Sequence, residues 1–316
     1  MKYAVKKILM LLLTMVIVSF LTFLAFSFLS GDPAERLLGT EATPERLEAL
    51  RIEMGLDHPL IIRYGHWLLN CLCGDLGKSY QYSLPVSTLI SQRVGHTLVL
   101  TLMALLLIVI VSIPLGVFTA KYAGGKLDKI LTIANQLLMS VPPFFTGILF
   151  SYFFGLLLNC FVLGAFPQPS DTFSYLSYLF FPALAIALPR IAMSVKLLRS
   201  CILEEAGRDY VRTSMSRGRS RGDILYRHVL KNTLVPLVTF LAVTMAELVA
   251  GSVVIEQVFA IPGIGRLLLS SISNRDYPVA QAIVVLLAFW VVLCNLAGDL
   301  LSRRIDPRLR KEMRRK

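Results

Sequence analysis

Long apolar runs without a charged side chain constrain this chain more than any other feature. No Asp, Glu, Lys or Arg lies between Lys7 and Asp32, or between Arg93 and Lys121. About 20 residues of helix cross the roughly 30 Å hydrocarbon layer of a bilayer, so each run is long enough to span a membrane. Charged residues make up only 16% of the chain, below the roughly 25% of an average soluble domain. The sequence therefore predicts an all-α membrane protein.

Four further spans follow the first two. The uncharged stretch 130–170 is too long for one helix, and Gly164, Pro167 and Pro169 interrupt its end, so it predicts a third span followed by a short loop. The fourth span contains prolines and is expected to be kinked. The first is expected to be retained, because its apolar core exceeds the 7–15 residues of a signal peptide. The six predicted transmembrane helices lie between Lys7 and Asp32, between Arg93 and Lys121, at the start of 130–170, and at 175–198, 234–255 and 279–301.

The placement of Lys and Arg predicts the orientation of these spans. With the N-terminus inside, the inner segments hold 23 of the 32 basic residues and the outer segments hold 8. Lys and Arg concentrate in cytoplasmic loops, so both termini are expected in the cytoplasm. The net charge of +12 could indicate a nucleic-acid partner. We exclude that class, because the charge is spread over loops that flank the membrane.

The same pattern divides the chain into four parts. Residues 1–29 form an N-terminal tail and the first helix, and 30–96 form a long extracytoplasmic loop. A short helix is expected in that loop at about 43–54, where Thr43 and Pro44 form a typical helix start. Residues 97–302 hold helices 2–6, with a charged cytoplasmic segment between helices 4 and 5. Residues 303–316 form a basic cytoplasmic tail.

The chain shows no motif for chemistry of its own. Its nearest approach to a phosphate-binding loop, Ala123–Leu127, lacks the spacing of G-x-x-x-x-G-K-[ST]. The zinc-protease and esterase motifs are missing, and the cysteines do not have metal-ligand spacing. We therefore expect no catalytic residue, no metal ligand and no bound cofactor. A self-sufficient secondary transporter remains an alternative, although such folds usually contain paired inverted repeats, which we do not find here.

The inner segment from Arg199 to Asn232 is dense in charge. Helical spacing places Ala206, Tyr210, Val211 and Met215 on one apolar face, with arginines elsewhere. Such a helix could lie under the membrane and bind anionic headgroups. It could equally dock into a groove on a cytoplasmic protein. The pattern alone does not separate the two.

The chain also resembles a known family in seven ordered motifs. They are Gly31–Pro33, Gly55–Leu60, Gly74–Ser79, Asp209–Thr213 with Arg217-Gly218 and His228–Asn232, Glu256–Phe259 with Pro262–Arg266, Arg275–Val279, and Asp306–Arg308. Together they resemble the bacterial ABC-importer permeases for dipeptides, oligopeptides and nickel, over nearly the whole chain. Two features differ from that pattern: the Ser- and Thr-rich connection 159–174, and Arg219, where an apolar residue is more usual.

The resemblance implies a location, partners and a site. The location is the bacterial inner membrane, and the chain would form half of a translocation path with a second, similar permease. Two cytoplasmic ATPase subunits would use ATP and Mg, and an extracytoplasmic binding protein would deliver substrate. The segment between helices 4 and 5 becomes the ATPase-coupling loop, with Gly218 expected to permit a turn and His228 and Asn232 to hold the return to span five. Its candidate residues are Glu205, Ala206, Asp209, Tyr210, Arg212, Thr213, Arg217, Gly218, His228 and Asn232.

Glu247 is the most informative residue for the translocation path. A carboxylate inside a span is costly to insert, by roughly 2.5–3.5 kcal/mol, and usually faces a cavity or a partner. It could pair within the bundle, with Arg190, the other path candidate, or with a hydroxyl, or it could line the path and favour a cation. The last possibility favours nickel or a nickel chelate, while dipeptides, oligopeptides and glutathione-like peptides stay open.

Overall fold

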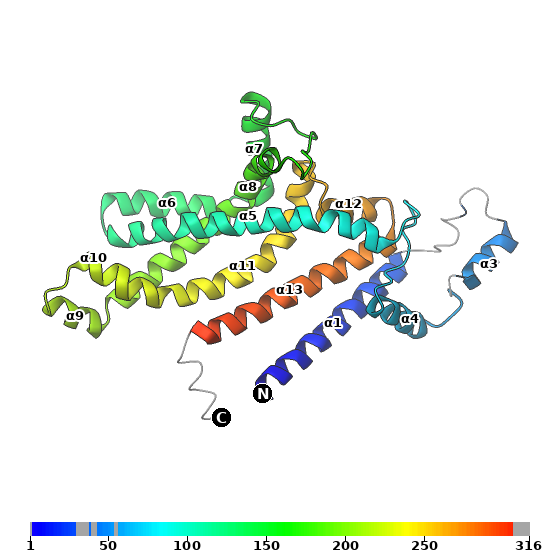
Figure 1. The fold of residues 1–316 in the computed structure, drawn as a ribbon, viewed down its shortest axis with the longest axis horizontal. Helices are drawn as coiled ribbons and strands as arrows, with labels where there is room; N and C mark the ends of the chain where they lie inside the picture. Colours follow the sequence, from blue (N-terminus) through cyan, green and yellow to red (C-terminus); the bar gives the residue numbers. More distant parts are fainter. Residues whose placement is uncertain (1, 30–37, 39–42, 54–55, 306–316) are drawn as a thin grey trace. The chain divides into compact units, whose positions relative to one another are not determined.

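The structure is a computed structural model that describes residues 2–29, 38, 43–53 and 56–305 (Figure 1). In this part of the chain the regular structure is helical, apart from an isolated β-bridge between Lys78 and Pro85. The all-α prediction is confirmed for the described residues. The elements are α1 (Lys2–Leu29), α3 (Pro44–Glu53), α4 (Leu60–Leu72), α5 (Val86–Lys121), α6 (Lys126–Ser140), α7 (Pro143–Phe150), η2 (Ser151–Leu157), α8 (Thr172–Ala206), α9 (Asp209–Ser216), α10 (Arg221–Ile224), η3 (Leu225–Val229), α11 (Leu230–Val258), α12 (Ile264–Ser273) and α13 (Tyr277–Ile305).

Five described helices are long and apolar enough to cross a membrane, and a bent pair makes a sixth candidate. The five lie within α1, α5, α8, the helical stretch 222–258 and α13, and they correspond to five of the six predicted spans. α5 begins at Val86, so the predicted outer loop, 30–96, ends in helix. The reason is that one arginine, Arg93, does not interrupt helical hydrogen bonding. The short helix expected at about 43–54 begins at Pro44.

The predicted third span differs most from expectation. We expected one helix and a break at 159–169, but α6 and the helix that follows it meet at an angle of 96° after Ser140. Val141 and Pro142 each precede a proline and take extended backbone, with ψ of 123° and 142°. The ring of a proline disfavours helical geometry in the residue before it, so Pro142 and Pro143 break the span in its middle.

The chain divides into two compact units. One consists of Met1–Gly95 with Pro262–Trp290, and the other of His96–Ile261 with Val291–Lys316. In the first unit, buried residues of α5, α12 and α13 form one apolar cluster. Asp276, which is buried beside this cluster, accepts hydrogen bonds from the Ser79 hydroxyl and from the Tyr80 backbone N–H (3.0 Å). These bonds join two of the seven motifs across nearly 200 residues of sequence.

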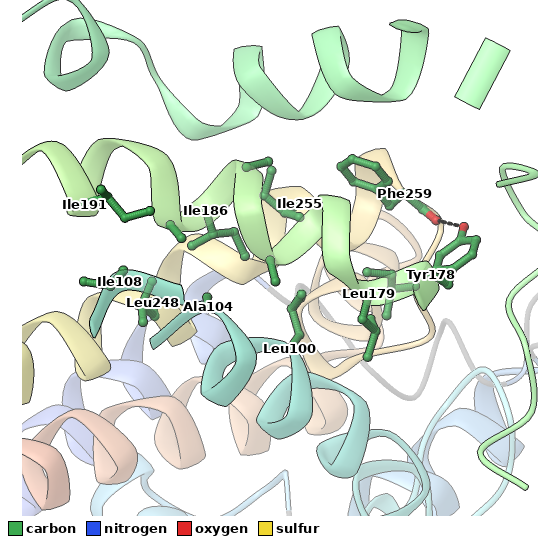
Figure 2. Close-up of a cluster of buried hydrophobic side chains, with 14 of the residues drawn as sticks. Leu100, Ala104, Ile108, Tyr178, Leu179, Ile186, Ile191, Leu248, Ile255 and Phe259 are labelled. Carbon is green, nitrogen blue, oxygen red and sulfur yellow. Dashed lines mark hydrogen bonds between the residues drawn. The ribbon is translucent and has the colours of Figure 1, made fainter. Parts of the chain in front are cut away.

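The core of the second unit lies between α5, α8 and α11 (Figure 2). Leu100 and Ile108 of α5, Leu179 of α8 and Ile255 of α11 are fully buried. The Tyr178 hydroxyl donates a hydrogen bond to the Phe259 carbonyl oxygen (2.6 Å), which ties α8 to the end of α11. Apolar packing and this hydrogen bond hold together α8 and α11, the two helices that the inner segment connects in the sequence.

Candidate functional site

Glu205 is the centre of the inner segment. It lies at the end of α8 with 8% of its surface exposed. Its Oε1 accepts hydrogen bonds from the Tyr210 hydroxyl (3.1 Å) and from the Asn232 side-chain amide (2.9 Å). Its Oε2 pairs with Nε of Arg208 (2.7 Å). One carboxylate thus connects the end of α8, the start of α9 and the start of α11.

This arrangement also affects Tyr210 itself. Burial, and then the hydrogen bond to Glu205, raise the pKa of the Tyr210 phenol. The hydroxyl is therefore a donor throughout the physiological pH range, because both effects favour its protonated form. The contact that holds α9 to α8 is accordingly insensitive to pH near neutrality.

Apolar packing fixes α9 on the same side. Val211 is 2% exposed and belongs to a cluster with Leu198, Ile202, Ile224 and Val229. The side chain that was expected to meet headgroups or a partner is thus buried in the chain's own helices. Apart from Met215, which is 42% exposed, the side chains that α9 presents outward are polar.

The expected apolar face is wrong in two of its four members. Tyr210 and Val211 turn inward, but Ala206 and Met215 are exposed. Ala206 is the last residue of α8, and a break at Gly207 separates it from α9. Helical spacing does not carry across such a break, which accounts for Ala206. Met215 shares α9 with Val211, but it lies in the last turn of the helix and is exposed there.

Gly218 ends α9 in the way the sequence predicts. Its φ of +81° lies in the left-handed region, which glycine adopts without steric cost. The Gly218 N–H donates to the Met215 carbonyl (2.9 Å), and the Arg219 N–H donates to the Ser214 carbonyl (3.3 Å). This pair of bonds is the Schellman arrangement that closes a helix C-terminus. The turn directs the chain back toward α10.

The outward face of α9 is formed by exposed candidate residues. The Thr213 hydroxyl donates to the Asp209 carbonyl within the helix (3.0 Å). Arg212 and Arg217 are exposed and do not belong to the buried cluster. The exposed candidates are Asp209, Arg212, Thr213 and Arg217.

The return from α9 to α11 uses both residues assigned to it. Asn232 bonds to Glu205, as described above. His228 lies in η3, and its Nε2 accepts from Nη1 of Arg219 at 2.6 Å. Arg219, the residue that departs from the family pattern, thus contacts a residue that follows it. Asp223 and Arg227 form a further pair at 3.1 Å.

The two candidates for the translocation path contact each other. Nη1 of Arg190 on α8 lies 2.5 Å from Oε2 of Glu247 on α11, and the Glu247 side chain is 44% exposed. The pairing of Glu247 with Arg190, one of the possibilities raised by the sequence, is observed. Both side chains are partly exposed, at 27% for Arg190 and 44% for Glu247. A molecule beside them would meet a positive and a negative charge together, not a single carboxylate.

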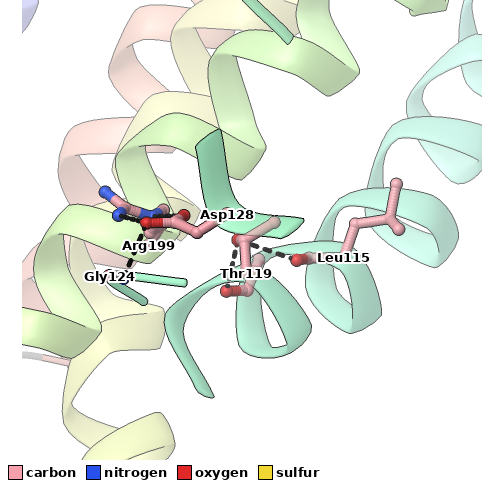
Figure 3. Close-up of polar contacts among 6 residues, drawn as sticks. Leu115, Thr119, Gly124, Asp128 and Arg199 are labelled. Atoms are coloured by element: carbon pink, nitrogen blue, oxygen red, sulfur yellow. Dashed lines mark hydrogen bonds and ion pairs between the residues drawn. The ribbon is translucent and has the colours of Figure 1, made fainter. Parts of the chain in front are cut away.

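One ion pair, between the start of α6 and the C-terminal part of α8, escaped the sequence analysis (Figure 3). Arg199 donates from Nε to Oδ1 of Asp128 (3.1 Å) and from Nη2 to Oδ2 (2.8 Å). The Gly124 N–H donates to the same Oδ2 (2.9 Å). The two partners are 71 residues apart, and the sequence signal was only an acidic residue within a basic turn.

Glu256 belongs to one of the seven motifs, but the sequence analysis did not name it as a site residue. It is fully buried and accepts a hydrogen bond from the Thr97 hydroxyl (2.6 Å). A buried carboxylate needs such donors. Among the described residues, His, Cys, Asp and Glu side chains form no group of three that could hold a metal ion.

Comparison with known proteins gives consistent matches. Residues 112–311 match the family described as "Binding-protein-dependent transport system inner membrane component", and residues 1–101 match its N-terminal companion. The chain is 34% identical over 309 residues to a probable peptide ABC transporter permease protein of Sinorhizobium fredii, covering 98% of this chain and 99% of that protein. It is 32% identical over 318 residues to a nickel import system permease protein of Staphylococcus aureus, covering 98% and 94%.

A solved structure has a similar fold. The inward-facing MetNI methionine ABC transporter aligns with a TM-score of 0.57, covering 69% of this chain and 96% of the matched chain, at 20% sequence identity. At that identity the likeness concerns the fold alone.

Proposed function

The chain belongs to the family of binding-protein-dependent transport system inner membrane components, and from that premise we propose how it works within an ABC importer. It is a membrane-embedded permease subunit. Membership of this family sets aside the self-sufficient secondary transporter. The family implies ATPase partners, which use ATP, and a substrate-binding protein.

We propose that α9 and the turn after it form the docking surface for an ATPase subunit. The observation that carries the proposal is the pair of hydrogen bonds that Glu205 accepts from Tyr210 and Asn232. They fix α9 relative to both α8 and α11. A helix held in this way transmits a push from its outward face to two membrane helices, because packed elements move as units. The exposed polar residues Asp209, Arg212 and Thr213 would meet the ATPase.

A photo-crosslinking amino acid placed at Thr213 tests this docking. We expect ultraviolet light to join the chain to its co-expressed ATPase in native membranes. Lys126, the exposed first residue of α6, is the matched control and should give a much weaker product. Equal products from both positions, or none from Thr213, would contradict the assignment.

The remaining assembly follows the family. We propose a second, similar permease as the other half of the path, two ATPase subunits with Mg and ATP, and an extracytoplasmic binding protein. Both termini lie in the cytoplasm in this arrangement, in agreement with the 23 basic residues of the inner segments. We place no catalytic residue and no resident cofactor on this chain.

We propose small peptides as the substrate class. A lone carboxylate at Glu247 would have favoured a metal cation, but Glu247 is paired with Arg190 at 2.5 Å. A neutralised pair loses most of its preference for a cation, while its two poles suit the charged ends of a peptide. Competition between a radiolabelled dipeptide and radiolabelled nickel, in cells that depend on this chain, tests the proposal. Nickel uptake without dipeptide uptake would overturn it and restore the nickel interpretation.

A substitution separates the roles of the pair. Glu247→Gln leaves Arg190 without its counter-charge inside a span, so we expect dipeptide uptake to fall at least fivefold. The double variant Arg190→Gln with Glu247→Gln removes both charges and should show whether the pair acts in transport or only in packing. Wild-type uptake in the single variant would remove Glu247 from the path.

A further inference from the structure

α4 exposes large apolar side chains although it belongs to none of the candidate membrane spans. At about 100° per residue, most of the exposed apolar side chains occupy an arc of roughly 100°, and the polar side chains of α4 lie on a separate side. The residues of this arc are Ile61 (76%), Ile62 (47%), Leu69 (63%) and Leu72 (77%), whereas Leu60 (38%), the first residue of the helix, lies outside it on the side of Tyr64 and Trp67. The polar side consists of Arg63, His66 and Asn70.

A third side of α4 packs on α1. The Tyr64 hydroxyl forms a hydrogen bond with the Ser19 hydroxyl (2.9 Å) and donates to the Val16 carbonyl (3.2 Å). The rings of Trp67 and Phe23 lie 5.9 Å apart. These contacts fix the direction of the exposed apolar side, because the side next to it is already occupied by α1.

The position of these contacts along α1 sets the depth of α4. The candidate span of α1 is Lys7–Phe28, and Phe23, whose ring meets Trp67, lies five residues before its end, or about 8 Å at 1.5 Å per residue. The Tyr64 hydroxyl, at the tip of a long side chain, reaches further along α1 to Ser19. α4 therefore lies beside the half of the span that ends at Phe28. That half must lie in the bilayer, and the Leu21 and Phe28 side chains of α1 are themselves exposed. The apolar side of α4 thus continues a surface that faces lipid.

We propose that α4 is an interfacial helix, whose exposed apolar side inserts among the acyl chains of the leaflet that surrounds the C-terminal half of α1. An amphipathic helix with an apolar side of this size binds the boundary between headgroups and chains. Tyr64 and Trp67 are of the aromatic types that concentrate at this level of a membrane. The segment between the first two spans is thereby anchored to the bilayer and does not project as a free loop.

Tryptophan fluorescence tests the proposal in the full-length chain, reconstituted in phosphatidylcholine vesicles. The two native tryptophans, Trp67 and Trp290, are first replaced by phenylalanine, which keeps a ring beside Phe23. A single tryptophan is then introduced by Leu72→Trp. The matched control is Asn70→Trp, two residues away on the polar side of the same helix.

The two quenchers report opposite environments. For Leu72→Trp we expect at least twofold stronger quenching by lipids brominated on their acyl chains than for Asn70→Trp, and correspondingly weaker quenching by aqueous acrylamide. Acrylamide quenching of Leu72→Trp equal to that of the control would show a water-exposed side and overturn the proposal. Protection from both quenchers would also overturn it, since it would mean that protein covers this side.

Discussion

Glu205→Ala should uncouple the importer without removing it from the membrane. The substitution deletes the acceptor of Tyr210 and Asn232 and the partner of Arg208. A hydrogen bond to a charged acceptor contributes roughly 1.5–3 kcal/mol. Asn232 and Arg208 are exposed, so water can replace most of the hydrogen bonding that they lose with Glu205. The exposed ion pair of Arg208 contributes only about 0–1 kcal/mol.

The half-buried Tyr210 hydroxyl therefore dominates the loss. We expect the docked position of α9 to lose about 2–3 kcal/mol, which corresponds to a roughly 30- to 150-fold shift toward the released position. The ATPase would then displace α9 without moving α8 and α11, so uptake should fall at least tenfold. Glu205→Gln keeps an acceptor oxygen for Tyr210 and should retain most of the activity.

The assay is ATP-dependent uptake of a labelled dipeptide, with membrane amounts measured by immunoblot. Glu204→Ala is the matched control, because Glu204 is the exposed neighbour of Glu205 on the same turn. Hydrogen exchange across 207–229 should rise in Glu205→Ala and stay unchanged in Glu204→Ala. Wild-type uptake in Glu205→Ala, at equal membrane amounts, would refute the reasoning. Equal losses in Glu205→Gln and Glu205→Ala would show that charge matters, not the acceptor atoms.

Three further predictions follow from single contacts. Gly218→Trp should abolish uptake and leave membrane insertion intact, because a residue with a Cβ at φ +81° costs about 1–2 kcal/mol and the ring adds bulk on the docking side; uptake and immunoblot measure both. Arg199→Lys should lower Tm in detergent, and Arg199→Ala should lower it further, since lysine cannot reproduce the two parallel bonds to Asp128. Asp276→Asn should lower the pKa of Tyr80, which burial and then the Asp276 charge raise to about 12; nuclear magnetic resonance of Cζ-labelled tyrosine measures it.

Each of these has a clear contrary outcome. Full uptake in Gly218→Trp would show that the turn after α9 does not face the ATPase. Equal Tm in Arg199→Lys and the wild type would mean that a point charge suffices at Asp128. An unchanged Tyr80 pKa in Asp276→Asn would leave burial as its whole cause.

The spans were predictable because the bilayer imposes a simple rule on composition. The long apolar stretches, two of them without any charge, located five long helices, and the positive φ of Gly218 agreed with a glycine placed after a short helix. The bend after Ser140 was missed, although Val141-Pro142-Pro143 carries the signal: two consecutive residues precede a proline. We gave more weight to the Gly and Pro cluster at 159–169, which lies after the break.

The contacts of the site were mostly beyond sequence reasoning. Glu205 was chosen through the family resemblance, but its partner Asn232 lies 27 residues away, and no spacing rule links them. The apolar face of the inner segment was wrong because the break at Gly207 separates Ala206 from α9. Asp128 and Arg199 meet only because α6 packs along α8, a relation set by tertiary structure.

ATP-driven accumulation of a labelled dipeptide, in vesicles that hold this chain with its co-encoded partner subunits and binding protein, tests the central claim most directly. We expect accumulation against a gradient that requires ATP, the ATPase subunits and the binding protein, and that disappears in Glu205→Ala. Accumulation by the chain without the ATPase subunits, driven by a proton or sodium gradient, would contradict the account.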